Sequence, residues 1–279
     1  MSETVTVVGA GTMGAGIAEV SAKAGYTVKL FDLDGGTLER ARARIEKSLG
    51  KAVERGKLDA SARDETLGRI AFVPEVASAV GAAWVIEAVP EDLRLKQKIL
   101  GTLADENPDC ILGSNTSSLS LTAIAGACAH PERVVGMHFF NPPPVMRFLE
   151  IVRAESTTDA VCERTQRFAD SIDHTAIVVR DVAGFATSRL GLVIGLEAMR
   201  MLEEGVASAK DIDLAMSKGY RHPMGPLELT DLVGLDVRLA IAEHLTRELG
   251  ERFEPPNILR EKVAAGKLGK KTGEGFYEW

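Results

Sequence analysis

The first half of the sequence alternates short apolar runs rich in β-branched residues with longer amphipathic segments. The apolar runs read TVTVV, TVKLF, RIAFV, WVIEAV, CILGS and RVVGMHF, at residues 4–8, 27–31, 69–73, 84–89, 110–114 and 133–139. Runs of this length and composition are typical of strands buried on both faces of a sheet. The amphipathic segments Leu38–Lys57 and Asp92–Glu106 supply the crossover helices that parallel strands require. We therefore predict an α/β domain with a doubly wound, Rossmann-type sheet.

The pattern changes after the run HTAIVVRD at residues 174–181. From Gly184 onward only helical stretches follow, separated by glycine and proline. We therefore predict an N-terminal domain at residues 1–182 and a smaller, all-helical domain at residues 183–279. The longest apolar stretch, AGFATSRLGLVIGLEAMRML, contains Arg189, Glu197 and Arg200, which favours a buried helix over a membrane span.

Composition narrows the class of protein. Of the 279 residues, 45% are hydrophobic and 26% are charged, as in a globular enzyme. The three cysteines, Cys110, Cys128 and Cys162, form no CxxC pair, so we expect buried free thiols and neither a metal site nor a disulfide framework. The N-terminus lacks the charged segment and cleavage site of a signal peptide, which predicts a cytoplasmic protein. A net charge of −7 argues against a nucleic-acid-binding surface.

The first apolar run is followed at once by GAGTMG, a GxGxxG motif made by Gly9, Gly11 and Gly14 around Thr12 and Met13. Such glycines permit a tight turn, close approach of a pyrophosphate to the backbone, and close packing of helix on strand. Asp32 ends the second run, eighteen residues after Gly14. A carboxylate there accepts hydrogen bonds from the adenosine ribose and repels a 2′-phosphate, which favours NAD over NADP. The alternative is that Asp32 caps the next helix, although Asp34 and Thr37 are better placed to do so.

A row of cations follows on the next predicted helix. Arg44, Lys47, Lys51 and Arg55 are spaced by three, four and four residues, which places them along one helix face. From the pattern alone, a solvated face with neighbouring glutamates (Glu39, Glu46 and Glu54) as partners is the better interpretation. The functional alternative is a surface that binds a polyanionic substrate such as a nucleotide-tailed thioester.

His138 ends the run RVVGMHF, and Glu150 lies twelve residues later in FLEIV. Between them stands NPPPV, which we expect to form a stiff turn between two strands and not a helix, because proline removes a backbone donor. With the turn centred near Pro144, His138 and Glu150 would face each other across the strand pair. A carboxylate in that place fixes the imidazole tautomer and stabilises the imidazolium. The pair is therefore a candidate general base for oxidising an alcohol with NAD.

Several motifs in order along the whole chain resemble those of the 3-hydroxyacyl-CoA dehydrogenases, and most closely the stand-alone 3-hydroxybutyryl-CoA dehydrogenases. They are GAGTMGAGIA, VIEAVPEDLRLKQ, SNTSSL, GMHFFNPPPVMRFLEI, the D-x-x-GF-x-x-x-R run at Asp181–Arg189, RHPMGPLELTDLVGLD and KLGKKTGEGFYEW. The resemblance implies reversible, NAD-dependent oxidation of (S)-3-hydroxyacyl-CoA in fatty-acid metabolism and β-oxidation. It also implies a catalytic dyad of His138 and Glu150, and a homodimer formed through the helical domain.

The resemblance also assigns roles to individual residues. Ser117 matches a serine between nicotinamide and substrate, Asn141 a residue near the nicotinamide, and Ser48 and Arg55 positions that contact coenzyme A, with Lys51 between them. Glu91, Lys96 and Lys271 match cofactor contacts; without the resemblance they would be interpreted as a helix-start acid, a surface lysine and part of a basic tail. One residue departs from the family pattern: GFATSR has Ser188 where the family usually has asparagine. A serine hydroxyl has less reach than an amide, so a water or a shifted substrate is expected to bridge the gap.

Two other functions fit parts of the sequence. A related dehydrogenase could act on free 3-hydroxy acids, and a non-catalytic relative, like the lens lambda-crystallins, could bind NAD without turnover. The row of cations argues against the first of these, and the presence of both His138 and Glu150 argues against the second.

Overall fold

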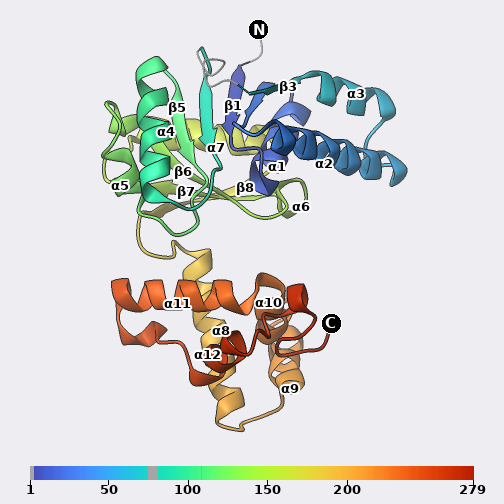
Figure 1. Cartoon of the computed structure of the whole chain (residues 1–279), viewed down its shortest axis with the longest axis vertical. Coiled ribbons are helices and arrows are strands. Elements are labelled where there is room, and N and C mark those ends of the chain that lie inside the picture. Colours follow the sequence, from blue (N-terminus) through green and yellow to red (C-terminus); the bar gives the residue numbers. More distant parts are fainter. Residues whose placement is uncertain (1–2, 75–80, 108) are drawn as a thin grey trace. The chain divides into compact units, whose positions relative to one another are not determined.

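The computed structural model describes residues 3–74, 81–107 and 109–279 and divides the chain into two compact units, Met1–Asp181 and Val182–Trp279 (Figure 1). The division falls one residue before the predicted boundary. The first unit contains all the named strands of the described residues, and the second is built from helices.

The strands of the first unit form one sheet in the order β3-β2-β1-β4-β5-β6-β7-β8. Their bounds are β1 Thr4–Val8, β2 Thr27–Phe31, β3 Ile70–Val73, β4 Trp84–Glu87, β5 Ile111–Ser114, β6 Val134–Phe139, β7 Phe148–Arg153 and β8 Thr175–Arg180. Neighbouring strands are parallel except β6 and β7, which are antiparallel. The predicted doubly wound sheet is therefore confirmed, and the exception occurs where the sequence predicts a strand, a turn and a strand.

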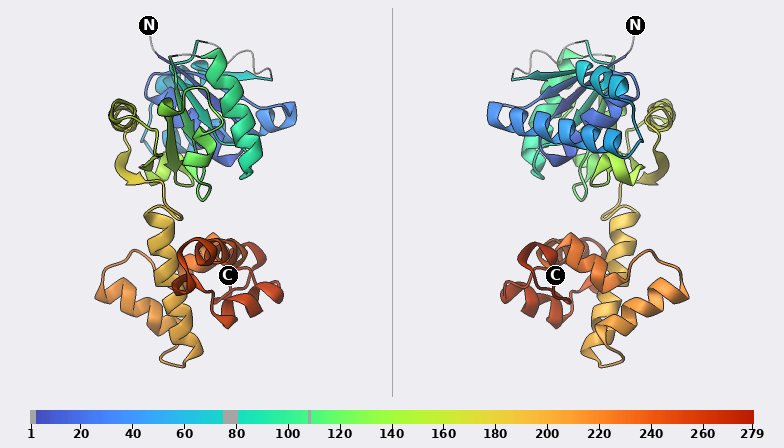
Figure 2. Two further views of the ribbon diagram at one scale, coloured as in Figure 1. Left: turned by 90° about the vertical axis from the view of Figure 1, so that its left-hand side faces the viewer. Right: turned by 90° about the vertical axis from the view of Figure 1, so that its right-hand side faces the viewer.

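Helices cover both faces of this sheet (Figure 2). Their bounds are α1 Thr12–Lys23, α2 Gly35–Glu54, α3 Ala60–Gly68, α4 Leu93–Glu106, α5 Leu121–Ala125, α6 Pro143–Met146 and α7 Asp159–Ser171, with a 3-10 turn η2 at Pro131–Arg133. One hydrophobic cluster joins α1, α2 and α7 to alternate strand residues such as Val7, Ile86 and Met137. Because successive strand residues point to opposite faces, His138 and Glu150 project from the other face.

The triple proline does not exclude a helix, contrary to the expectation for NPPPV. Pro142 has extended geometry and α6 begins at Pro143, so Pro143 and Pro144 occupy the first helical positions. Those positions need no backbone N–H, and the fixed φ of proline suits them. The short helix ends at Arg147, which adopts a left-handed φ of 43° and starts the return to β7. The turn between β6 and β7 is therefore compact and contains one helical turn.

The second unit consists of α8 Thr187–Glu203, α9 Ala209–Leu214, a π-helical turn η3 Ala215–Gly219, α10 Pro226–Val233, α11 Leu235–Leu249 and α12 Asn257–Ala264, with 3-10 turns η4 Glu251–Phe253 and η5 Lys270–Thr272. The prediction of a buried helix for the long apolar stretch is correct only for one side of α8. Leu192, Leu196 and Met199 are fully buried, whereas Leu190 and Val193 are exposed. Both sides of α8 carry apolar residues, but packing within the second unit covers only one of them.

A buried carboxylate holds the C-terminal segment in place. Asp231, on α10, is 1% exposed and accepts hydrogen bonds from the backbone N–H groups of Phe276 and Tyr277 and from the indole N–H of Trp279. The distances are 2.8, 2.9 and 2.9 Å. Among the described residues, no cationic side chain forms an ion pair with Asp231, so these N–H donors are what hold the carboxylate.

Candidate active site

The glycine-rich loop joins the end of β1 to the start of α1 and packs without room for a side chain at two positions. A Cβ on Gly14 would lie 1.7 Å from the carbonyl oxygen of Gly9, and Gly9 itself has a φ of +99°. A Cβ on Gly11, in contrast, would meet no atom within 4 Å, so this side of the loop is open. Gly11 is the N-cap of α1, and no side chain caps the helix. Its first N–H groups can therefore bind a pyrophosphate.

Asp32 lies where β2 ends, beside the same loop. Its carboxylate accepts a hydrogen bond from the backbone N–H of Ala10 at 2.9 Å and another from that of Asp34 at 3.0 Å. The helix α2 is capped by Asp34, which accepts from the N–H groups of Gly36 and Thr37. Asp32 is therefore not the helix cap. Its carboxylate lies beside the glycine loop, at the place of the acid that hydrogen-bonds the ribose of a dinucleotide in this fold.

Lys96 is a buried residue and not the surface lysine that the sequence pattern alone suggested. It is 1% exposed, and its Nζ lies 2.7 Å from Glu87 Oε1, 3.2 Å from Glu91 Oε2 and 3.2 Å from the carbonyl oxygen of Val89. Glu87 is fully buried at the end of β4 and also accepts from the hydroxyl of Ser114, its register partner on β5. The ammonium is thus shared between two carboxylates, of which Glu87 was missed in the sequence.

Glu91 fixes the loop that carries Ser117. Its Oε1 accepts from the hydroxyl of Thr116 at 2.7 Å and from the backbone N–H groups of Ser117 and Ser118 at 2.9 and 3.1 Å. Burial acts to raise the pKa of Glu91, but the hydrogen bond from Thr116 and the charge of Lys96 outweigh it and lower the pKa. Glu91 is therefore ionised at neutral pH. Ser117 is exposed, and the neighbouring helix α5 is capped by Ser120.

His138 and Glu150 are register partners on the antiparallel strands β6 and β7, as the sequence predicts. His138 Nδ1 lies 2.8 Å from Glu150 Oε2. Glu150 is fully buried, and His138 is 7% exposed. The geometry assigns the Nδ1 proton to a hydrogen bond with the carboxylate, which leaves Nε2 as the basic nitrogen of the neutral ring. This arrangement suits the ring for taking and returning a proton.

Aromatic and polar side chains pack around His138 and the end of β6. The ring of Phe140 lies against the imidazole of His138, with 4.6 Å between centroids, and also contacts Phe148. The Asn115 side chain accepts the backbone N–H of Phe139 at 2.9 Å and ties the end of β6 to the loop after β5. Asn141 is exposed at the start of the turn, and its peptide bond to Pro142 is cis.

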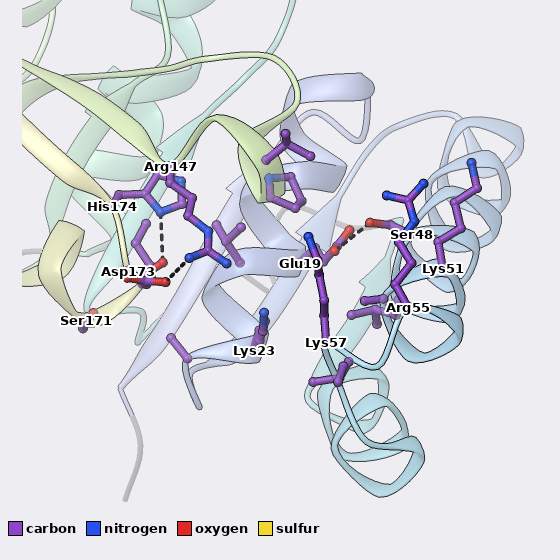
Figure 3. Close-up of a pocket in the computed structure, with 18 residues that line it drawn as sticks. Glu19, Lys23, Ser48, Lys51, Arg55, Lys57, Arg147, Ser171, Asp173 and His174 are labelled. Carbon is purple, nitrogen blue, oxygen red and sulfur yellow. Dashed lines mark hydrogen bonds and ion pairs between the residues drawn. The ribbon is translucent and has the colours of Figure 1, made fainter.

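A groove of about 670 Å³ lies on the first unit between α1, α2 and the turn after β6 (Figure 3). Ser48, Lys51 and Arg55 of α2 line one wall. Three glutamates of the same helix could neutralise the row of cations on α2, namely Glu39, Glu46 and Glu54. Among the described residues, none of them forms an ion pair with these cations. The groove therefore presents a cationic wall to solvent, and Ser48, Lys51 and Arg55 share it.

Two predicted site residues belong to the second unit. Ser188 lies in the first turn of α8, and no side chain caps that helix. Lys271 lies in η5 and forms an ion pair with Asp236 of α11 at 2.5 Å. The structure therefore gives Lys271 a partner within its own unit.

Two negative findings apply to the residues that the structure describes. Residues 3–74, 81–107 and 109–279 contain no cluster of histidine, cysteine and carboxylate side chains suited to holding a metal ion. Within the same ranges, every helix is too short or too polar to cross a bilayer. Cys110, Cys128 and Cys162 are buried free thiols, as predicted.

Comparison with known families agrees with this geometry. The sequence model described as 3-hydroxyacyl-CoA dehydrogenase, NAD binding domain, matches residues 4–182, and the model of the C-terminal domain of the same family matches residues 184–279. The chain belongs to the 3-hydroxyacyl-CoA dehydrogenase family. It is therefore an NAD-dependent dehydrogenase, and the prediction of NAD as its cofactor is confirmed.

Individual members of this family resemble the chain over its full length. A 3-hydroxybutyryl-CoA dehydrogenase of Mycobacterium tuberculosis is 43% identical, with 99% of this chain and 98% of that protein covered. The mitochondrial hydroxyacyl-coenzyme A dehydrogenase of Sus scrofa is 38% identical, with 99% and 90% covered. The solved structure of (S)-3-hydroxybutyryl-CoA dehydrogenase from Ralstonia eutropha superposes with a TM-score of 0.96 at 37% identity, covering 100% and 99% of the two chains.

Proposed function

We propose that the protein catalyses the reversible, NAD-dependent oxidation of (S)-3-hydroxyacyl-CoA to 3-ketoacyl-CoA, with 3-hydroxybutyryl-CoA as a substrate. The observation that supports this most strongly is the buried pair of His138 and Glu150, 2.8 Å apart on facing strands of an NAD-binding sheet. The names of relatives of similar length, which refer to 3-hydroxybutyryl-CoA, support this substrate class.

In the forward direction, Nε2 of His138 takes the proton of the substrate 3-hydroxyl group. NAD, when bound, supplies the acceptor for the hydride that leaves the same carbon. Glu150 keeps the Nδ1–H tautomer in place and stabilises the positive charge that the ring acquires. In the reverse direction the imidazolium returns its proton to the forming alkoxide, so one side chain serves as base and as acid.

The cofactor is held by the glycine loop and by Asp32, and the loop of Ser117 completes the site. Gly9, Gly11, Thr12, Met13 and Gly14 form the pyrophosphate-binding turn, and Glu91 with Lys96 fixes the loop after β5. Ser117 and Asn141 would position substrate and nicotinamide. Following the resemblance, we assign a substrate contact to Ser188 and a cofactor contact to Lys271. Both residues belong to the second unit.

The row of cations on α2 supports a coenzyme A substrate over a free acid. Ser48, Lys51 and Arg55 line one groove, and none of the acidic residues on their own helix pairs with them among the described residues. Phosphate groups are recognised by such clusters of ammonium, guanidinium and hydroxyl donors. A free 3-hydroxy acid has no polyanionic tail to fill this groove.

We also propose that the protein forms a homodimer through its helical unit. Leu190 and Val193 on α8 and Leu232 on α10 are exposed by 64%, 42% and 40%, a cost that burial against a second copy would remove. Light scattering at micromolar protein checks this part of the proposal. A monomer mass at that concentration would contradict it.

One assay tests the proposed reaction. Purified protein is mixed with NADH and acetoacetyl-CoA, and oxidation of NADH is followed by absorbance. Steady turnover is expected, with free acetoacetate as the control substrate giving none. Turnover of acetoacetate alone would indicate a free-acid dehydrogenase. Loss of all turnover with acetoacetyl-CoA and with longer 3-ketoacyl-CoAs, while NADH still binds, would indicate a non-catalytic NAD-binding protein.

A further inference from the structure

A carboxyl group lies at the floor of the cationic groove and takes no part in the reaction proposed above. Glu19, on α1, is 6% exposed, and its Oε1 accepts a hydrogen bond from the hydroxyl of Ser48 on α2 at 2.8 Å. Figure 3 shows this contact with the groove cations around it. An acid is unexpected in a groove suited to anions, because its negative charge repels the ligand.

The hydrogen bond between the two side chains limits what Ser48 can do. A serine hydroxyl has one proton to donate. While Glu19 is ionised, Ser48 donates that proton to it and offers only lone pairs to a ligand. When Glu19 is protonated, its own O–H can donate to Ser48 Oγ, and the Ser48 proton becomes available to a phosphate oxygen. Protonation of Glu19 therefore removes a negative charge from the groove and frees the hydroxyl proton of Ser48 for a hydrogen bond to the ligand.

Other charged groups also line the groove. They are Lys23 on α1, Lys51 and Arg55 on α2, Lys57 after it, and the pair of Arg147 and Asp173 on the opposite wall, joined at 2.6 Å. His174 also lines the groove, and burial lowers its pKa, so it is neutral there.

Glu19 can exchange its proton in the neutral range. Burial raises its pKa to about 7, although the hydrogen bond from Ser48 and the charge of Lys23 act in the opposite direction. A polyanion beside the carboxyl would raise that pKa further by repulsion.

We propose that Glu19 is a positioning residue which acts through Ser48, so that binding of the phosphate-bearing tail of the substrate is coupled to uptake of one proton by Glu19. The inference rests on the proposed coenzyme A substrate class. Phosphate recognition in this groove is then favoured below neutral pH and weakened above it, whereas the chemical step at His138 is not linked to Glu19.

Calorimetric titration of the full chain with coenzyme A, between about pH 6 and about pH 8.5, tests the coupling. Repeating each titration in buffers of different ionisation enthalpy gives the number of protons taken up. The wild type is expected to take up a fraction of a proton, and its Kd should rise by up to about tenfold per pH unit above neutral. In Glu19→Gln, the amide can donate to Ser48 permanently, so the Kd should stay near the low-pH value of the wild type.

The phosphates of coenzyme A also exchange protons, but equally in both titrations. The difference in proton uptake between the wild type and Glu19→Gln therefore reports Glu19 alone. Glu46→Gln, an exposed glutamate on α2 outside the groove, is the matched control and should behave as the wild type. Equal proton uptake in the wild type and in Glu19→Gln would overturn the coupling while leaving the substrate class intact. Absence of coenzyme A binding in both proteins, with NADH binding normal, would overturn the substrate class and the coupling together.

Discussion

Replacing Glu150 with glutamine tests the proposed dyad with the smallest change of shape. In the wild type, the carboxylate faces an imidazole that becomes positive during the reaction, with 2.8 Å between Oε2 and Nδ1. Two unit charges about 4 Å apart at an effective dielectric constant of about 20 attract by about 4 kcal/mol. Because each 1.36 kcal/mol corresponds to about tenfold in rate, losing this attraction lowers kcat by about 10³-fold.

The assay is the steady-state rate of NADH oxidation by acetoacetyl-CoA, together with a fluorescence titration of NADH. The NADH affinity should stay within about twofold, because Glu150 faces His138 and not the glycine loop. Glu155→Gln, an exposed glutamate shortly after β7, is the matched control for the amide substitution and should keep full activity. A kcat for Glu150→Gln within about threefold of the wild type would refute the reasoning.

Four further predictions follow from the site and the fold. Asp32→Ala should reduce the preference for NAD over NADP, measured as the ratio of kcat/KM values, because the variant no longer repels a 2′-phosphate. Combined Lys51→Glu and Arg55→Glu should raise KM for acetoacetyl-CoA at least about tenfold without changing NADH affinity; an unchanged KM would favour a merely solvated helix face. Asp231→Ala leaves three N–H donors of the C-terminal segment without their acceptor, so urea unfolding should show a loss of about 3 kcal/mol or more. Since the folded pKa of Glu19 is raised to about 7, its neutral form stabilises the fold below pH about 4.5, and that contribution of about 3 kcal/mol disappears as pH rises through 7. Thermal unfolding of Glu19→Gln should lack this loss, and the variant should be the more stable protein at pH about 8.

The position of the dyad could be predicted from the sequence because every step was local. His138 and Glu150 lie at equal distances from Pro144, and a hairpin brings such residues together whatever the rest of the chain does. The glycine loop was predictable for the same reason, since strand, motif and helix follow one another directly. The structure confirms the contact and the register, and the catalytic role stays a prediction until the assay is done.

The residues that the sequence did not reveal depend on contacts between distant segments. Glu87 is buried because β4 and β5 pair in a register that places it opposite Ser114, and Lys96 is buried because Glu87 and Glu91 both neutralise it. Glu19 meets Ser48 because α1 packs on α2, 29 residues apart along the chain. No local pattern marks these residues, since a lone charged residue in an amphipathic helix is normally at its surface.

The short helix α6 was missed for a different reason. Proline breaks a helix in its interior, whereas Pro143 and Pro144 are at the start of α6. Because prolines are accepted at these first positions, a single helical turn can form between β6 and β7.

The hairpin of β6 and β7 limits which length changes the gene can tolerate. Surface turns usually accept insertions and deletions, but side chains in a strand alternate between faces at every residue. Loss or gain of one residue between Phe139 and Phe148 that slipped the register would turn Glu150 to the opposite face of the sheet, away from His138. Homologues that catalyse the reaction are therefore expected to vary in the side chains of this turn and to keep its number of residues.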